Sequence, residues 1–337
     1  MCVTPNIDLS VTAIGGYHKR YSREIWQHIR GQMVINKITN PVRGVRGQYI
    51  MPNYQEGNMI QPFRCPFEPS DLGTFKVSKE ENYHIKIDKS IGCLDDLVET
   101  FLSQYDELGL SGDDQTKIGN KFYQWLLENH WGDKIAEEIE YASFRGVRND
   151  LGTTYIDSMN GWGTKLQNMI SSSVLTPIST GVINAGNIYN KTEGFVSVIP
   201  PAAFAPKHKG YLVMSPTMLD MLYYDRITQL GNHTYFTDRN APFFIGPPNR
   251  QVQVIALPGM EGSTMMMYTP RWNFLRMYNE IDGPSNTFSI EQKIRCMHVA
   301  TDHWTGYGFG MCEYIYVNDQ PIGTMPALGS GCPIMNI

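Results

Sequence analysis

Residues 243–275, FFIGPPNRQVQVIALPGMEGSTMMMYTPRWNFL, combine strand and turn signals more densely than any other part of the chain. Val252, Val254 and Ala256 occupy alternate positions, which is the period of a β-strand, and a Pro-Gly turn follows them. A Gly-Ser turn then precedes Met265–Met267, whose adaptable side chains suit a strand buried on both faces. This stretch therefore predicts two strands separated by turns.

The end of the same stretch predicts a connection between two parts of the molecule. Thr269-Pro270 should end the second strand, and Arg271–Asn273 should begin the crossing to another part of the fold. Arginine and aromatic residues are enriched at protein–protein interfaces. We therefore predict that Arg271 and Trp272 are contact residues.

Upstream, HKGYLVMSPTMLDMLYYDRI (residues 208–227) predicts a buried strand that leads directly into a helix. Tyr211–Met214 form the short apolar run, and Ser215-Pro216 have the composition of a helix start, with proline in the first turn. A further short helix is expected around Lys165–Ile170.

Downstream, FSIEQKIRCMHVAT (residues 288–301) and TGYGFGMCEYIYV (residues 305–317) predict a long antiparallel pair. The glycines of Gly306–Gly310 are expected to form the turn between the two strands. A phosphate-binding loop is disfavoured here because neither a following helix nor a Lys-Ser/Thr pair accompanies these glycines.

The first half of the chain is predicted to be mainly helical after an extended region. Apolar residues at helical spacing predict a helix over Tyr21–Ile35, preceded by a tail that is either disordered or tied down on a neighbouring chain. Residues 40–90 are rich in Pro, Gly and Asn, and Thr74–Ser90 alternate like a β-hairpin. Helices are predicted over Cys93–Leu110 and, as one long helix, over 113–144. The fold class is therefore α+β.

Composition limits the class of protein. The 337 residues carry a net charge of −5, whereas a dedicated nucleic-acid binder would show a strong basic excess. The 18 methionines, 19 tyrosines and 14 phenylalanines, with only 18% charged residues, favour large buried contacts, although a large monomeric core would give the same composition. The chain has neither a secretory signal nor an apolar run of about 18 residues, so no membrane partner is expected.

No catalytic or metal motif emerges from the chain. Six scattered cysteines without a CxxC pair indicate reduced thiols in a cytoplasmic setting. The best metal candidates are Cys296, His298, His303 and Cys312, but their spacing matches no zinc pattern, and ordinary strand residues explain them better. We therefore expect no metal, no cofactor and no enzymatic activity.

The tetrapeptide RGVR occurs twice, at Arg43–Arg46 and Arg145–Arg148. Four residues are too few to establish a repeat, and surface arginines in turns explain both copies. The alternative is that Arg43, Arg46, Arg145 and Arg148 anchor contacts between subunits, where arginine is enriched.

Three stretches together resemble the major capsid protein of tailed bacteriophages. They are HKGYLVMSPTMLDML, the stretch quoted first, and TFSIEQKIRCMHVATDHWTGYGFGMCEYIYV. The resemblance lies in the order of features along the whole chain, including the patterns VxxLPGM and MxxTPxxN, and in no catalytic signature. The fold it implies is the Hong Kong ninety-seven-like fold, shared with encapsulins and herpesvirus capsid floors.

The resemblance implies a division of the chain into the parts of a capsid subunit. These are an N-terminal arm with a short helix (1–40), an extended loop (41–90), a peripheral domain with the long helix 113–144 (91–170), an axial domain (171–283), and return strands with a C-terminal tail (284–337).

It also implies self-assembly into hexamers and pentamers that form an icosahedral shell around double-stranded DNA. The expected location is the virion capsid, after assembly in the host bacterial cytoplasm. Expected partners are other copies of the chain, a separate scaffolding protein, a portal, decoration or head-fibre proteins, and the packaged genome through weak contacts. The alternatives are an encapsulin-like container and a cytoplasmic α+β enzyme using the Cys296/His298/His303 region.

Overall fold

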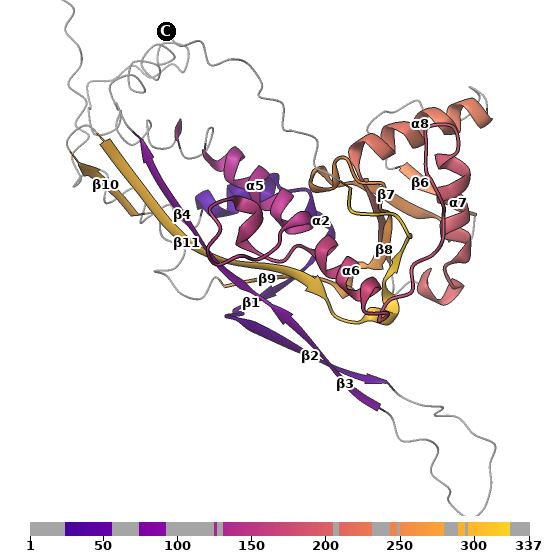
Figure 1. Cartoon of the computed structure of the whole chain (residues 1–337), viewed down its shortest axis with the longest axis horizontal. Helices are drawn as coiled ribbons and strands as arrows, with labels where there is room; N and C mark the ends of the chain where they lie inside the picture. Colours follow the sequence, from indigo (N-terminus) through magenta and orange to yellow (C-terminus); the bar gives the residue numbers. More distant parts are fainter. Residues whose placement is uncertain are drawn as a thin grey trace, which may run out of the picture.

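The computed structural model describes residues 24–55, 74–91, 125–126, 131–204, 209–230, 243–247, 250–279, 289–293 and 296–323. The predicted helix Cys93–Leu110 and the first part of the predicted helix 113–144 lie outside these residues. Within them the chain is α+β, with two sheets, helices packed on both, and a separate two-stranded hairpin (Figure 1).

The first sheet is built around the long strand β11 (Cys296–Phe309). Its other strands are β1 (Asn40–Arg43), β4 (Tyr83–Ile91), β9 (Phe274–Tyr278) and β10 (Ser289–Lys293). β4 and β10 both pair with residues 297–300 of β11 and therefore flank it on opposite sides, while β9 pairs with its last residues. β1 extends the sheet as a parallel neighbour of β9.

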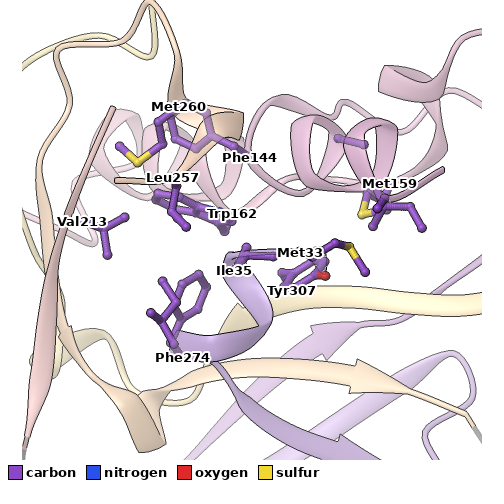
Figure 2. Close-up of a cluster of buried hydrophobic side chains, with 14 of the residues drawn as sticks. Met33, Ile35, Phe144, Met159, Trp162, Val213, Leu257, Met260, Phe274 and Tyr307 are labelled. Carbon is purple, nitrogen blue, oxygen red and sulfur yellow. The ribbon is translucent and has the colours of Figure 1, made fainter. Parts of the chain in front are cut away.

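A layer of helices packs against the first sheet (Figure 1). It contains a helix over 24–32, α2 (Ile35–Ile38), α5 (Gly132–Arg145), the 3-10 helix η2 (Tyr155–Ser158) and α6 (Trp162–Ser171). In Figure 2, Phe144 and Trp162 of this layer lie across the core from Phe274 of the sheet. The Trp162 ring is 4.6 Å from that of Phe144 and 5.5 Å from that of Phe274, between ring centres.

The buried carboxylate of Glu140 attaches the N-terminal region to α5. Its two oxygens accept hydrogen bonds from the backbone N–H groups of Val34, at 3.0 Å, and Ile35, at 3.2 Å. These are first-turn groups of α2 that no intrahelical acceptor can satisfy. Burial raises the pKa of Glu140, and the two hydrogen bonds oppose that shift.

The second sheet has the order β12-β8-β5-β7-β6. Its strands are β5 (Gly210–Met214), β6 (Phe243–Ile245), β7 (Val252–Ala256), β8 (Met267–Pro270) and β12 (Tyr316–Val317). The helices α7 (Ile188–Val198) and α8 (Pro216–Leu230) and the 3-10 helix η3 (Pro201–Phe204) complete this part of the molecule. Its core is a second hydrophobic cluster.

Several sequence predictions are confirmed in this second part. The strand Tyr211–Met214 is β5, and the following helix starts at Pro216 as predicted. Ser215 caps that helix, because its Oγ accepts a hydrogen bond from the N–H of Met218 at 3.2 Å.

The methionine run lies between the two cores. Met265 and Met267 pack in the first hydrophobic cluster, whereas Met266 packs in the second. Alternate side chains of an extended segment point to opposite sides, so one short run contacts both cores. The prediction that this segment is buried on both faces is confirmed. After β8, the 3-10 helix η7 (Arg271–Asn273) leads into β9 of the first sheet, although the predicted axial range 171–283 includes β9.

The third unit is a hairpin of β2 (Gln48–Gln55) and β3 (Thr74–Glu81), which pair antiparallel along their whole length. Neither strand pairs with any other described strand. In Figure 1 the hairpin extends away from both sheets.

Two predictions about strand pairing are wrong. Thr74–Ser90 is no hairpin: β3 pairs with β2, and β4 pairs with β11, with Asn82 between them. Alternation predicted both strands, but it does not encode which strand each one joins.

The glycine-rich segment also forms no turn. Gly306 and Gly308 lie inside β11, which continues to Phe309. Their lack of a side chain leaves room for a crossing segment: a Cβ at Gly308 would overlap Oε2 of Glu80, and one at Gly306 would lie 2.6 Å from the carbonyl oxygen of Glu81. The glycines therefore mark the place where the hairpin crosses the sheet.

The long predicted helix is described in part, as α5. α5 corresponds to the last part of the predicted helix 113–144, and Ile135, Ile139 and Ala142 are among its buried residues. Among the described residues, no helix combines the length and the apolar character that a membrane crossing requires.

Candidate assembly interface

At the base of the β2–β3 hairpin, the connection from β1 to β2 meets the connection from β3 to β4. Gly44 and Gly47, at φ 74° and 72°, allow the chain to turn from β1 into β2. Asn82, between β3 and β4, donates from its side chain to the carbonyl of Val45 at 2.6 Å and from its backbone N–H to that of Gly47 at 2.5 Å. The two strands of the hairpin therefore leave the sheet from one fixed point.

A buried ion pair fixes the direction of the hairpin. One oxygen of the Glu80 carboxylate accepts from Nζ of Lys165 on α6 at 2.5 Å, and the other accepts from the N–H of Phe309 at 3.0 Å. Lys165 also donates to the carbonyl of Tyr307 at 2.7 Å. Removing one partner of such a buried pair costs about 3–5 kcal/mol, because the other charge is left uncompensated. This cluster, Glu80, Lys165 and the β11 backbone at 307–309, is called the hairpin anchor below.

The outer face of the hairpin carries apolar side chains that the rest of the chain leaves about half exposed. Ile50 pairs with Lys79 and Pro52 with Val77, so these four residues share one face. Ile50 is 54% exposed and Val77 is 50% exposed. On the opposite face, Ser78 and Glu80 are directed to β11. A two-stranded hairpin is marginally stable on its own, so an uncovered apolar face suits a contact with another chain.

Further large apolar side chains are exposed on the second sheet and its helices. They are Val182, Val198, Tyr224, Leu230 and Phe244. They belong to α7, α8, the edge strand β6 and the segment before α7. This part of the molecule therefore has exposed apolar side chains of its own, apart from those of the hairpin.

The structure places the predicted contact residues in different settings. Arg43 and Arg46 are exposed beside the hairpin base. Arg145, by contrast, is buried and donates to the backbone carbonyls of Gly259 and Gly323, both at 3.3 Å, and of Glu261. Burial lowers the pKa of its guanidinium. Arg145 thus holds two loops of its own chain together.

Arg148 stabilises the loop that follows α5. Its guanidinium binds Asp150 at 2.7 Å and the carbonyl of Ser158 at 2.7 Å. Leu151, between these two partners in sequence, is 92% exposed. The loop therefore presents two exposed apolar side chains, Val147 and Leu151, and Arg148 fixes its backbone through Asp150 and Ser158.

Arg271 and Trp272 lie in η7, at the crossing between the two sheets. Arg271 is exposed, and its backbone N–H donates to the carbonyl of Lys209 at 3.1 Å. Trp272 is half-buried against Tyr314, with 5.1 Å between ring centres. Their role as contacts with another subunit stays a prediction.

The proposed Cys/His region does not form a shared site among the described side chains. His298 and His303 are five residues apart on β11, so they lie on opposite faces of the sheet. His303 is buried against Trp26, and Cys312 is half-buried in the 3-10 helix Cys312–Tyr314. No group of three potential metal ligands occurs among the residues that the structure describes.

Neither the hairpin anchor nor the structural role of the Asn82 side-chain amide was predicted from the sequence. Glu80 and Lys165 are 85 residues apart, and nothing in either segment indicates the other. One signal was present: glycines at 306, 308 and 310 recur with the period of a strand, which indicates close approach of another backbone.

Comparison with solved structures identifies the fold. The satellite phage P4 procapsid including size determination (Sid) protein matches with a TM-score of 0.51 and 13% identity, over 88% of this chain and 98% of that chain. The Gordonia phage Cozz structure matches with a TM-score of 0.50 and 10% identity, over 85% of this chain and 86% of that chain. The chain thus has the α+β, Hong Kong ninety-seven-like fold of tailed-phage capsid proteins.

No protein family model matches the chain, and no curated protein matches it in sequence. The resemblance stated from the sequence is confirmed at the level of the fold.

Proposed function

We propose that this chain is the major capsid protein of a tailed bacteriophage, a structural subunit that assembles with its own copies into a closed shell. The observation that carries the proposal is the β2–β3 hairpin, which is anchored rigidly at its base yet leaves Ile50 and Val77 uncovered. A solitary subunit gains nothing from such a face. In a shell, a neighbouring subunit would cover it. The similarity to phage capsid structures supports the same conclusion.

The proposed division of labour follows the sequence predictions, with 41–90 as the extended loop, 91–170 and 284–337 as the peripheral domain, and 171–283 as the axial domain. Residues 1–40 would form the arm, although its helix over 24–32 packs in the core of its own subunit. The exposed apolar residues of α7, α8 and β6 would then face the symmetry axis of a hexamer or pentamer. Many modest contacts of this kind add up in a closed shell, because each subunit is held at several places.

The finer parts of the proposal concern partners and location. We place the protein in the virion capsid, assembled in the bacterial cytoplasm with a separate scaffolding protein, a portal and decoration or head-fibre proteins. The packaged double-stranded DNA would touch the shell only weakly, because a subunit with a net charge of −5 cannot condense it. Arg43, Arg46, Arg148, Arg271 and Trp272 remain our candidates for contacts between subunits.

Negative-stain electron microscopy and sedimentation of the expressed full-length chain test the proposal. We expect capsomers, tubes or closed shells, and a chain that stays monomeric at all concentrations would overturn the assignment. The contents of particles purified from infected cells separate the two shell functions: nuclease-protected DNA supports the phage capsid, whereas a packaged enzyme supports an encapsulin-like container.

A further inference from the structure

The helix over 24–32 packs on the first sheet through an aromatic stack with a buried histidine. His303, on β11, is only 3% exposed. Its imidazole lies parallel to the Trp26 ring, with 4.3 Å between ring centres and 18° between ring planes. Ile25 and Ile29 of the same helix are buried in the surrounding core. The histidine is therefore part of the surface on which the helix docks.

Three cationic groups of the described residues act on His303. Arg30 comes from the docked helix, Arg276 from β9 and His84 from β4. The two arginines lie 4.9 and 5.0 Å from the centre of the Tyr278 ring, which keeps them in place beside the histidine. Burial, and then these three cations, lower the pKa of His303 well below its usual value of 6.5.

His84 has a different setting on the neighbouring strand. It is exposed, it stacks on Trp304 with 4.6 Å between ring centres, and its Nε2 lies 3.9 Å from a carboxylate oxygen of Asp302. A proton on His84 is thus compensated by a nearby negative charge and by water, whereas a proton on His303 would be buried away from water with Arg30 and Arg276 nearby.

Protonation therefore opposes docking. The docked state binds a proton on His303 less readily than the undocked state, in which the imidazole is solvated with a pKa near 6.5. The docking free energy is at its full value above this pH and decreases as the pH falls below it, down to the lowered pKa of the docked state. Between about pH 7.5 and about pH 5.5, this linkage weakens docking by about tenfold.

We infer that His303 is an acid-sensitive latch, which holds the helix over 24–32 on the sheet at neutral pH and loosens it in acid. This device concerns the isolated subunit as much as an assembled one, so it does not depend on the shell function proposed above. The helix over 24–32 would thus attach to the sheet reversibly, under the control of pH.

Hydrogen–deuterium exchange of the full-length chain, measured by mass spectrometry and corrected for intrinsic exchange, tests the latch. We expect the protection of amides 24–32 to fall about tenfold between about pH 7.5 and about pH 5.5, while amides of α7, in the other core, keep their protection. The substitution His303→Gln, which removes the titrating group, should abolish this pH dependence.

His298→Gln is the matched control, because His298 lies on the opposite face of the same strand and should leave the pH dependence unchanged. The inference is overturned if His303→Gln retains the full loss of protection, or if His298→Gln removes it. Should His303→Gln fail to fold, the wild-type chain decides alone: a loss confined to 24–32 supports the latch, and a loss shared equally with α7, or none, rejects it.

Discussion

At the scale of single residues, buried asparagines connect segments that lie far apart in the chain. Asn273, in η7, accepts from the N–H of Met311 at 2.6 Å and donates to Thr269 Oγ1 and to the carbonyl of Met311. It is the asparagine of the MxxTPxxN pattern. Its role is structural, because it aligns the end of β8 with the segment that follows β11.

Asn318 plays the same part for the methionine run. Its Oδ1 accepts from the N–H of Met266 at 2.8 Å, and its Nδ2 donates to the carbonyl of Thr264 at 3.0 Å. The side chain is fully buried. It therefore ties the C-terminal segment to the strand that separates the two cores.

We predict that Asn318→Ala lowers the free energy of unfolding by about 1–3 kcal/mol for each of the two backbone groups left without a partner. Urea unfolding of the full-length chain measures this loss. Asn149→Ala, in the exposed loop after α5, is the control and should cost far less. Equal effects of the two substitutions would show that the Asn318 clamp contributes nothing particular.

At the scale of secondary-structure elements, glycine decides where the hairpin crosses β11. The crossing brings Glu80 against Gly308 and Met51 against Gly310, closer than any side chain at either glycine would allow. The hairpin anchor then ties β3 to α6, and Asn82 ties the two hairpin connections to each other. The direction of the hairpin is thus set at its base.

Gly308→Ala should destabilise the fold by several kcal/mol, because the added methyl displaces the Glu80 carboxylate and leaves Lys165 buried without its partner. Gly194→Ala is the matched control. Gly194 lies inside α7 with open space where the methyl would be placed, so this substitution should stabilise by about 0.5–1 kcal/mol. Thermal unfolding of both variants measures the contrast, and a harmless Gly308→Ala would contradict the proposed crossing.

The elements also show what could be predicted from the sequence. The strand β5, the helix start at Ser215-Pro216 and the buried methionine run were predictable, because each depends on a local pattern of alternation or capping. The partners of β3 and β4 could not be predicted in the same way. β4, for example, pairs with β11, which lies more than 200 residues away in the sequence.

The same reason explains the candidate contacts. Arg145 and Arg148 are the two arginines of one RGVR tetrapeptide, yet Arg145 is buried in its own chain and Arg148 supports an exposed loop. Local sequence identifies an arginine in a turn, but only the tertiary fold determines which carbonyl or carboxylate it meets. The hairpin anchor was unpredictable for the same reason.

At the scale of the whole molecule, the two sheets, the helix layer and the protruding hairpin form the fold that the chain shares with tailed-phage capsid proteins. The methionine run joins the two cores, and the hairpin extends away from both sheets (Figure 1). The rigid base and apolar outer face of the hairpin are the features that most directly connect this subunit to the assembly we propose.

The central claim is that the outer face of the hairpin is an assembly contact, and sedimentation with negative-stain microscopy of Ile50→Asp/Val77→Asp tests it most directly. Both side chains are half exposed in the subunit, so the variant should fold with an unchanged urea midpoint. The conservative Ile50→Val/Val77→Ile variant is the control and should assemble like the wild type. We predict that the aspartate variant stays as folded, unassembled subunits under conditions in which the wild type forms shells or tubes. Normal particles from the aspartate variant would contradict the claim.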